Sequence, residues 1–397
     1  MQRFTPKQYL QLDIASNYGL DKANWDVRLD WFQRHEATLE AYVDSAETPA
    51  LYYAGVQAYR AVQRGEPIGY PISMDATSSG LQLLAVLTGD RKAASICNVV
   101  NTGHRMDAYT VIYQMMLGVL GEDGQLTRND TKQAIMTALY GSKAVPKEVF
   151  GEGPLLNLFY ATMGEAAPAA WELNEAFLSM WDNTKLCNSW VLPDNFHVHV
   201  KVMGQVQNTV HFLGGNYDTF QKVNMTQEEG RSLGANTVHS LDGMIVREMV
   251  RRCSYDPKTI IRVLDALDDV GEMGCDDDAY MVRKLWTHYQ MSGYLSARIL
   301  DHLFYDNIHM VDAEVIKDLI RSLPRVPFQL MTVHDCFRCL PNYGNDLREQ
   351  YNLQLHLIAK SNLLQHLVSQ ILGRPVQVDK VDPTLADDIL EADYALS

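Results

Sequence analysis

The chain has 397 residues, of which 34 are basic and 49 acidic, so its formal net charge is −15. This length predicts two or three lobes, and 47% hydrophobic with 21% charged residues argues against disorder or a coiled coil. The acidic balance argues against a protein that grips a phosphate backbone over its whole surface. Six cysteines are too few for a disulfide scaffold, and we expect neither a signal peptide nor membrane attachment, so the cytoplasm is the simplest location.

Helical periodicity dominates the sequence. The expected helices are an amphipathic stretch opening at 29–32, then 109–120 and 132–139, the last with a stop at 141. The expected strands are 68–74, a hairpin arm over 191–202, and the pair 328–333 and 337–340 around a tight turn. Acidic clusters at 276–278 and from 379 onward are expected to be solvated. Mostly helix with a small antiparallel sheet indicates an α+β fold, and the lack of a clean linker predicts lobes interleaved along the chain.

Two aspartates stand at the ends of expected strands. Asp75 precedes a turn of small residues, and Asp335 lies between two apolar strands. Two such carboxylates from distant segments can meet on neighbouring strands and hold a pair of Mg²⁺ ions, which take oxygen ligands and bind substrate phosphates. A metal pair ~3.5–4 Å apart can stabilise both the attacking and the leaving oxygen of phosphoryl transfer. The alternative, that each aspartate only caps a turn, stays open for either residue alone.

One expected helix has the pattern of a phosphate-binding surface. Arg128 and Lys132 are four residues apart and so share a helical face, which Met136 and Tyr140 continue toward Gly141. Arginine gives forked bonds to phosphate oxygens and lysine a point charge. A phenol and a glycine at the far end suit a sugar and base. The alternative is an amphipathic helix with two solvated cations and a glycine cap.

Together these segments resemble the single-subunit RNA polymerases of bacteriophages and mitochondria. The main matches are Met-Asp-Ala-Thr-Ser-Ser-Gly-Leu-Gln at 74–82, the Arg-x3-Lys-x7-Tyr-Gly-Ser string at 128–142, and Val-His-Asp at 333–335. Weaker matches follow the family's order at 19–22, 190–196, 238–243 and 388–395. The similarity runs from about residue 9 to the C-terminus.

The resemblance implies two bound Mg²⁺ ions and assigns their ligands. Asp75 and Asp335 match the metal-coordinating aspartates, and the backbone carbonyl of Ala76 is a further ligand. Arg128 and Lys132 match the cations that bind the triphosphate, and Lys132 is also a proton donor to pyrophosphate.

The remaining matches concern the nucleotide pocket. Tyr140 matches a tyrosine that selects ribose over deoxyribose, Gly141 the glycine beside it, and Tyr109 another tyrosine of the pocket. His239 matches a histidine that senses the ribose edge. His334 would position Asp335 and the primer end, although a lone histidine can equally be structural.

The implied fold is a right hand without a thumb or N-terminal domain. The expected parts are a first palm segment with a palm insertion over 1–103, fingers over 104–239, a second palm segment over 240–350 with extra helices at about 244–325, and a C-terminal palm or foot over 351–397. Segment 197–234, where relatives place a promoter-reading hairpin, is comparatively short.

Departures from the family pattern are also informative. Gln11 stands where the family has a nucleotide-contacting lysine, so that contact is expected to be lost. The start just upstream of the palm resembles the large polypeptide of the split second RNA polymerase of Enquatrovirus-type phages. We therefore expect a separate small subunit that supplies the thumb and N-terminal parts, and a DNA-binding recruiting factor as a further candidate partner, in an infected bacterial cytoplasm.

The implied activity is template-directed RNA synthesis from ribonucleoside triphosphates, with a DNA template and nascent RNA as partners. A family-A-like DNA polymerase is one alternative. It usually carries an aromatic residue where Met136 stands and a glutamate where Cys336 stands, so the RNA reading is favoured. A non-catalytic polymerase-fold scaffold is the other alternative, and retention of the aspartates and cations argues against it.

Overall fold

The computed structural model describes residues 1–121, 126–226, 232–268 and 279–397, so the acidic cluster at 276–278 lies outside the described residues. The described part is mostly helical and contains three small antiparallel sheets, as the α+β prediction requires. No helix in these ranges combines the length and apolar character needed to cross a membrane.

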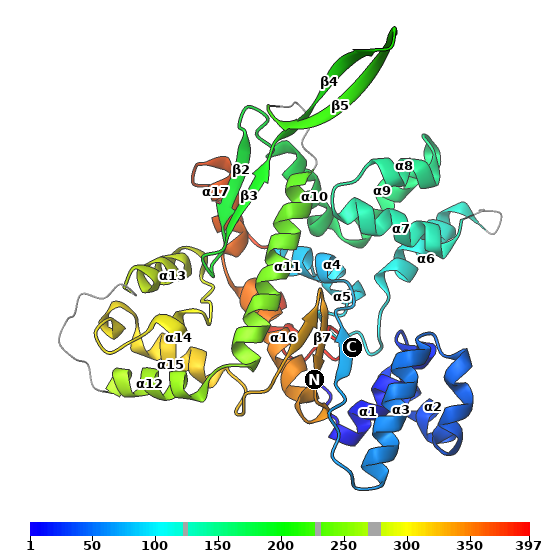
Figure 1. Ribbon diagram of the computed structural model, residues 1–397, viewed down its shortest axis with the longest axis vertical. Coiled ribbons are helices and arrows are strands. Elements are labelled where there is room, and N and C mark those ends of the chain that lie inside the picture. The colour runs from blue at the N-terminus through cyan, green and yellow to red at the C-terminus, as the bar shows by residue number, and fades with distance from the viewer. Residues whose placement is uncertain (122–125, 227–231, 269–278) are drawn as a thin grey trace.

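A three-stranded sheet lies at the centre of the molecule (Figure 1). Its antiparallel strands, in spatial order, are β1 (Ile72–Asp75), β7 (Cys336–Cys339) and β6 (Met331–Val333). Strands β6 and β7 confirm the predicted pair around a tight turn. Both β1 and β6 begin later than predicted. Pro71 has no N–H for the ladder, and the N–H groups of Phe328 and Leu330 donate to Cys253 and Ser254 instead.

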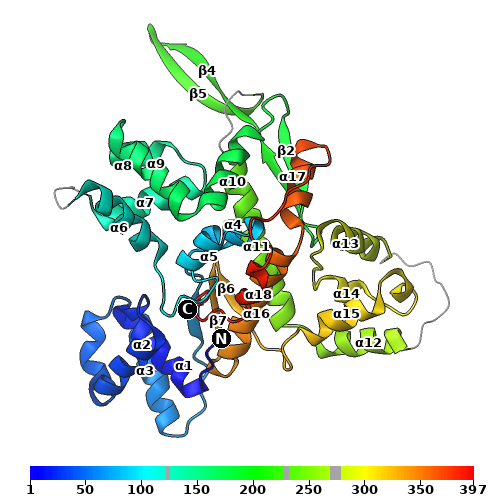
Figure 2. The same ribbon diagram turned by 180° about the vertical axis from the view of Figure 1, so that it is seen from behind.

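Three helices form a group on one side of this sheet in both views (Figures 1 and 2). They are α1 (Pro6–Ala15), α2 (Trp25–His35) and α3 (Pro49–Gln63). Helix α1 starts with a capping box, in which Thr5 and Gln8 each bond the other's backbone N–H. Helix α2 confirms the amphipathic stretch predicted around 29–32.

The buried Asp13 side chain ties α1 to β1. It accepts hydrogen bonds from the Ser73 N–H at 2.8 Å, the Tyr70 hydroxyl at 2.7 Å and the Asn17 amide at 3.0 Å. Ser73 lies two residues before Asp75, so this carboxylate helps to fix the strand that ends at the first predicted catalytic aspartate. Burial raises the pKa of Asp13 to about 6.

A series of helices follows β1, and the first of them, α4, is buried along its whole length. They are α4 (Ser79–Thr88), α5 (Arg91–Ile96), α6 (Ala108–Leu120), α7 (Arg128–Leu139), α8 (Ala144–Phe150), α9 (Pro154–Ala166) and α10 (Pro168–Ser179). Helices α6 and α7 confirm the predictions at 109–120 and 132–139. Asp107 and Thr127 set their first turns, because each side chain accepts a backbone N–H there.

Two hairpins follow. One joins β2 (Cys187–Val191) to β3 (His197–Lys201), and the other joins β4 (Met203–Phe212) to β5 (Gly215–Asn224). The arm predicted over 191–202 is thus a turn and one strand, with Val191 ending the strand before it. The β4–β5 hairpin is almost wholly exposed and projects away from the rest of the molecule in both views (Figures 1 and 2).

The long helix α11 (Ser232–Cys253) crosses the middle of the molecule beside α4 and leads into a helical lobe (Figure 1). This lobe comprises α12 (Pro257–Asp268), α13 (Ala279–Ser292), α14 (Ile299–His302) and α15 (Ala313–Arg321). Its buried residues form a hydrophobic cluster separate from the main core. The segment expected to hold extra helices, 244–325, is helical in much of its described part, but its first ten residues belong to α11.

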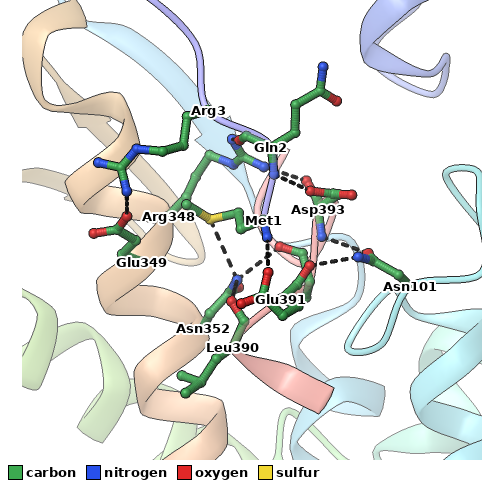
Figure 3. A network of polar contacts seen from close by, with 11 residues as sticks. Met1, Gln2, Arg3, Asn101, Arg348, Glu349, Asn352, Leu390, Glu391 and Asp393 are labelled. Carbon is green, nitrogen blue, oxygen red and sulfur yellow. Dashed lines mark hydrogen bonds and ion pairs between the residues drawn. The ribbon is translucent and has the colours of Figure 1, made fainter. Parts of the chain in front are cut away.

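Helices α16 (Gly344–Lys360), α17 (Leu363–Leu372) and α18 (Leu385–Ile389) complete the chain. Figure 3 shows how both chain ends lie against α16. The Met1 ammonium pairs with Glu391, and the Gln2 N–H donates to Asp393. Buried Arg348 of α16 donates to the carbonyl oxygens of Gln2 and Asp393, each at 2.7 Å. Because α16 packs on α4, this network places the C-terminal segment near the central sheet.

The raised pKa of Asp13 predicts a specific pH dependence of stability. Between pH 4 and pH 6 the folded state retains a proton that the unfolded state releases, so the Asp13 contribution to stability falls as pH rises through this window. Asp13→Asn stays neutral, so its free energy of unfolding relative to wild type should rise by up to about 3 kcal/mol between pH 4 and pH 7.

Urea unfolding at several pH values measures this difference. Asp44→Asn, which removes an exposed carboxylate, is the matched control and should follow the wild-type profile. Parallel profiles for Asp13→Asn and wild type would contradict the prediction.

Candidate active site

A cavity of about 280 Å³ opens where the central sheet meets helices α4, α6 and α7. It brings together six of the residues predicted from the sequence, which come from four distant segments: Asp75, Ala76, Tyr109, Lys132, Tyr140 and Asp335. Its other lining residues are Asp21, Lys22, Thr77, Ser78, Ser79, Gly80, Arg105, Asp107, Met136 and Leu139. Arg128, Gly141, His239 and His334 lie outside its lining.

The two aspartates meet through strand pairing. Asp75 ends β1 opposite Cys336, and Asp335 occupies the turn just before Cys336. The Ala76 N–H donates to the Asp335 carbonyl oxygen at 3.2 Å, which locks the two strand ends together. Burial raises the pKa of Asp335, and the negative charge of Asp75 raises it further. The sheet therefore holds two carboxylates close enough to repel each other.

This donor set fits Mg²⁺. Carboxylate and carbonyl oxygens are the ligands that Mg²⁺ takes, and a divalent cation would relieve the repulsion between Asp75 and Asp335. The Ala76 carbonyl oxygen accepts no backbone hydrogen bond among the described residues and so stays available as a ligand. No cluster of three or more histidine, cysteine, aspartate or glutamate side chains suited to a metal occurs in the described part of the chain. Water and substrate oxygens would complete the coordination, as is usual for Mg²⁺.

The C-terminal segment is hydrogen-bonded to the residues around Asp75, outside the cavity lining. The Ser397 N–H donates to the Asp75 carbonyl oxygen at 3.0 Å, and the Thr77 N–H donates to Ala395 at 3.3 Å. Buried Gln82 donates to the same Ala395 carbonyl at 2.9 Å and accepts from the Tyr351 hydroxyl at 2.7 Å. Sequence periodicity carries no signal for such contacts, because they join segments that are far apart in the sequence.

The side chains of Arg128 and Lys132, predicted to share a helical face, have different partners in the structure. Lys132 faces the cavity, where its ammonium lies 5.5 Å from the centre of the Tyr109 ring. Arg128 instead pairs with the Asp107 carboxylate and donates to the Thr110 hydroxyl at 2.7 Å. Both cations lie on α7 four residues apart, as predicted, and the N-terminal end of α6 offers Arg128 a carboxylate that holds its guanidinium.

Tyr140 packs tightly among three elements. Gly80 lies directly against it, since a Cβ at that position would come within 2.9 Å of the Tyr140 hydroxyl. The rings of Tyr140 and His239 are 4.5 Å apart and inclined by 31°. Burial raises the pKa of Tyr140 to about 12, so the phenol keeps its proton at neutral pH and can donate it. His239 itself is exposed on α11.

Two other predicted residues lie beside this cavity. Gly141 has φ of 80°, a left-handed conformation that favours glycine, and it lines a small neighbouring cavity with Trp171 and Asn174. His334 is exposed in the β6–β7 turn with φ of 55°. It directly precedes Asp335 in the chain.

Four charged residues of the cavity were missed by sequence reasoning: Asp21, Lys22, Arg105 and Asp107. Asp107 carried a usable signal, because aspartate directly before a predicted helix is a typical N-cap. Burial raises the pKa of Asp107, but hydrogen bonds from Thr110 and Arg128 outweigh this effect and hold that pKa below its usual value. Asp21 and Lys22 belong to a weaker match at 19–22 to which no role had been assigned.

Asp242 is a further carboxylate near the pair. It lies three residues after His239 on α11, and burial, followed by the negative charge of Asp335, raises its pKa to about 6. Its segment was noted in the sequence only for its resemblance to a family motif.

A larger cavity, of about 690 Å³, lies between the ends of α16 and α17 and the segment 375–380. Its Lys380 ammonium donates to the carbonyl oxygens of Val86 and Leu87 at 3.0 and 3.1 Å, so this cation satisfies the end of α4. Its described lining contains no pair of carboxylates. The smaller cavity therefore remains the better candidate for chemistry.

Comparisons with known proteins point to one class of enzyme. Residues 5–149 match a family described as DNA-dependent RNA polymerase. The chain is 27% identical over 161 residues to the mitochondrial DNA-directed RNA polymerase of Neurospora crassa, covering 34% of this chain and 11% of that protein. It is 29% identical over 172 residues to the DNA-directed RNA polymerase of Pseudomonas phage phiKMV, covering 39% of this chain and 21% of that protein. The matches thus span well under two thirds of either relative, and they support an enzyme related to these polymerases.

Proposed function

We propose that this chain is the catalytic part of a DNA-directed RNA polymerase that adds ribonucleotides to an RNA 3′ end. The observation that carries the proposal is the convergence of Asp75, Asp335, Lys132 and Tyr140 on one cavity. Two carboxylates, a cation and a neutral phenol are the groups that metal-assisted nucleotidyl transfer and ribose recognition need. The similarity to mitochondrial and phage RNA polymerases supports the same reaction class.

In this proposal the reaction joins the RNA 3′-oxygen to the α-phosphorus of the incoming nucleotide and breaks the bond to pyrophosphate. Asp75, Asp335 and the Ala76 carbonyl would hold two Mg²⁺ ions. When bound, Mg²⁺ supplies charge that favours the attacking alkoxide and the pyrophosphate leaving group. Lys132 binds phosphate oxygens and gives a proton to the departing pyrophosphate.

The pocket end of α7 would select the sugar. Tyr140 donates its hydroxyl proton to the ribose 2′-hydroxyl, and the neighbouring His239 borders the same edge. Gly80 allows the close packing that fixes the phenol, and Gly141 allows the left-handed backbone turn that follows Tyr140. Arg128 holds Asp107 and so supports the start of α6 beside Tyr109, and its phosphate contact would require it to leave that ion pair.

The proposed architecture is a right hand. The palm is formed by 1–103 and 240–350, the fingers by 104–239, and the C-terminal palm or foot by 351–397. The exposed β4–β5 hairpin lies in the segment where a promoter-reading hairpin is expected, and its ten-residue strands give it more reach than the sequence length suggested. The reaction would take place in the cytoplasm of an infected bacterium.

The two alternative functions, a DNA polymerase and a non-catalytic scaffold, predict different properties. A DNA polymerase should favour deoxynucleotides, whereas the comparisons give RNA polymerases. A non-catalytic scaffold needs no converging carboxylates, and their mutual repulsion is hard to explain without a cation to bind.

Asp335→Asn tests the catalytic assignment. Loss of one charged ligand should lower Mg²⁺-dependent ribonucleotide incorporation by more than about 100-fold, since even outer-shell changes at metal sites cost 10–100-fold. Primer extension measures the rate, and Asp44→Asn, at an exposed residue outside the cavity lining, is the control. Unchanged incorporation by Asp335→Asn would refute the proposed site.

Tyr140→Phe tests sugar selection. Without the hydroxyl, the preference for ribonucleotides over deoxynucleotides should fall by roughly tenfold, because one hydrogen bond is lost. The ratio of kcat/KM for the two substrates measures the effect. Tyr53→Phe, on an exposed tyrosine of α3, should keep the wild-type ratio. An unaltered ratio in Tyr140→Phe would remove the residue from the selection mechanism.

We further propose that a separate small subunit supplies a thumb and N-terminal parts, as in the split polymerases that the sequence resembles, and that a DNA-binding factor can recruit the enzyme. Adding the small subunit to the purified chain should then raise primer extension and the length of the products. Equal rates with and without the subunit would reject the heterodimer.

A further inference from the structure

Arg105 occupies a place in the cavity to which neither the sequence motifs nor the comparisons give a role. It lies in the connection between α5 and α6 and lines the same cavity as Asp75, Lys132 and Asp335. Its backbone N–H donates to the Asn24 side chain at 2.7 Å, which fixes the connection to the start of α2.

The charge of Arg105 is poorly compensated within the protein. Its Nε donates to the Ser397 hydroxyl at 3.1 Å, and its two terminal nitrogens have no hydrogen-bond partner among the described residues. It forms no ion pair with a described carboxylate, in contrast to Arg128, which pairs with Asp107. Burial lowers the pKa of Arg105, and the attraction of Asp21 and Asp107 does not offset that effect. A partly buried guanidinium remains charged, so free donors in a cavity favour an anionic ligand.

The nearby charges strengthen this preference. Lys22 and Lys132 line the same cavity, and fully buried Arg28 lies close enough to Arg105 that their positive charges repel. The guanidinium of Arg28 is hydrogen-bonded within the protein, because it donates to the Ala23 carbonyl oxygen at 3.0 Å and to the Ser16 hydroxyl at 3.0 Å. An anion in this cavity could therefore contact cations from two different segments, Arg105 and Lys132.

The sequence also leaves a position for such a cation open. Gln11 stands where the resemblance places a nucleotide-contacting lysine. Its side-chain amide donates to the Tyr59 hydroxyl at 3.4 Å, and Gln11 does not line the cavity. The expected contact is thus missing at Gln11, while Arg105, a cation outside the matched motifs, lines the cavity from another segment.

We propose that Arg105 binds a phosphate group of the incoming nucleoside triphosphate, together with Lys132. The inference rests on the proposed function and deepens it. A guanidinium can give two parallel hydrogen bonds to phosphate oxygens, and the terminal nitrogens of Arg105 are the donors left for them. A phosphate of the nucleic-acid backbone offers the same chemistry, but Arg105 and Lys132 share one cavity, which favours the triphosphate.

Three variants separate ligand binding from structural support. Arg105→Gln removes the charge, Arg105→Lys keeps the charge but not the fork, and Ser397→Ala removes only the hydroxyl that Arg105 contacts. Arg105→Gln should raise the KM for ribonucleoside triphosphates by about tenfold or more, with a smaller change in kcat, and Arg105→Lys should fall between it and wild type. Ser397→Ala should keep the wild-type KM.

Equilibrium binding of a fluorescent ATP analogue with Mg²⁺ gives a readout that needs no turnover. It should weaken by a similar factor in Arg105→Gln, and primer–template affinity should stay unchanged. The inference is overturned if nucleotide affinity is unaltered, if Ser397→Ala reproduces the effect, or if only primer–template affinity falls, which would assign Arg105 to the backbone. Wild-type chain that binds the analogue but makes no RNA, alone or with the proposed small subunit, would count against the proposed function and leave this binding test valid.

Discussion

Two negative charges are held together by the pairing of β1 with β7. The buried side chains of Ile72, Met74 and Phe337 fix the register of these strands, and that register sets Asp75 beside the turn that holds Asp335. Electrostatics alone would separate the two carboxylates, whereas the backbone ladder and the apolar packing behind it keep them in place. Helices α4, α6 and α7 border the cavity that contains this pair. Lys132 and Tyr140 can therefore act with the aspartates only if the sheet holds the pair in place.

The net charge of −15 is consistent with a site that binds phosphate. Lys22, Arg105 and Lys132 bring positive charge into the cavity beside its four aspartates. Because partly buried charges are screened less by salt than charges on an open surface, these local cations matter more to a bound triphosphate than the acidic exterior does. What the acidic exterior lacks is surplus charge for holding duplex DNA without help.

Local features of the fold were accessible from the sequence, and long-range ones were not. The α6 and α7 helices and the turn at 334–335 follow from periodicity and capping, which depend on neighbouring residues. The late start of β1 follows from Pro71, because proline has no N–H for the strand ladder. This rule could have been applied to the sequence. By contrast, the turn of Arg128 toward Asp107 and the approach of Arg105 to the cavity depend on which segments meet in space. A resemblance located several residues of the cavity, but it could not show where a side chain outside the matched motifs points.

The antiparallel pairing of β1 with β7 also has a kinetic consequence. Helices form from contacts between near neighbours, on a timescale of microseconds, whereas this sheet must close a loop that contains most of the chain. We therefore expect the cavity to be among the last parts of the molecule to assemble. A refolded preparation can regain its helical circular dichroism while the aspartates are still apart. Its active fraction would then report how many molecules have closed the central sheet.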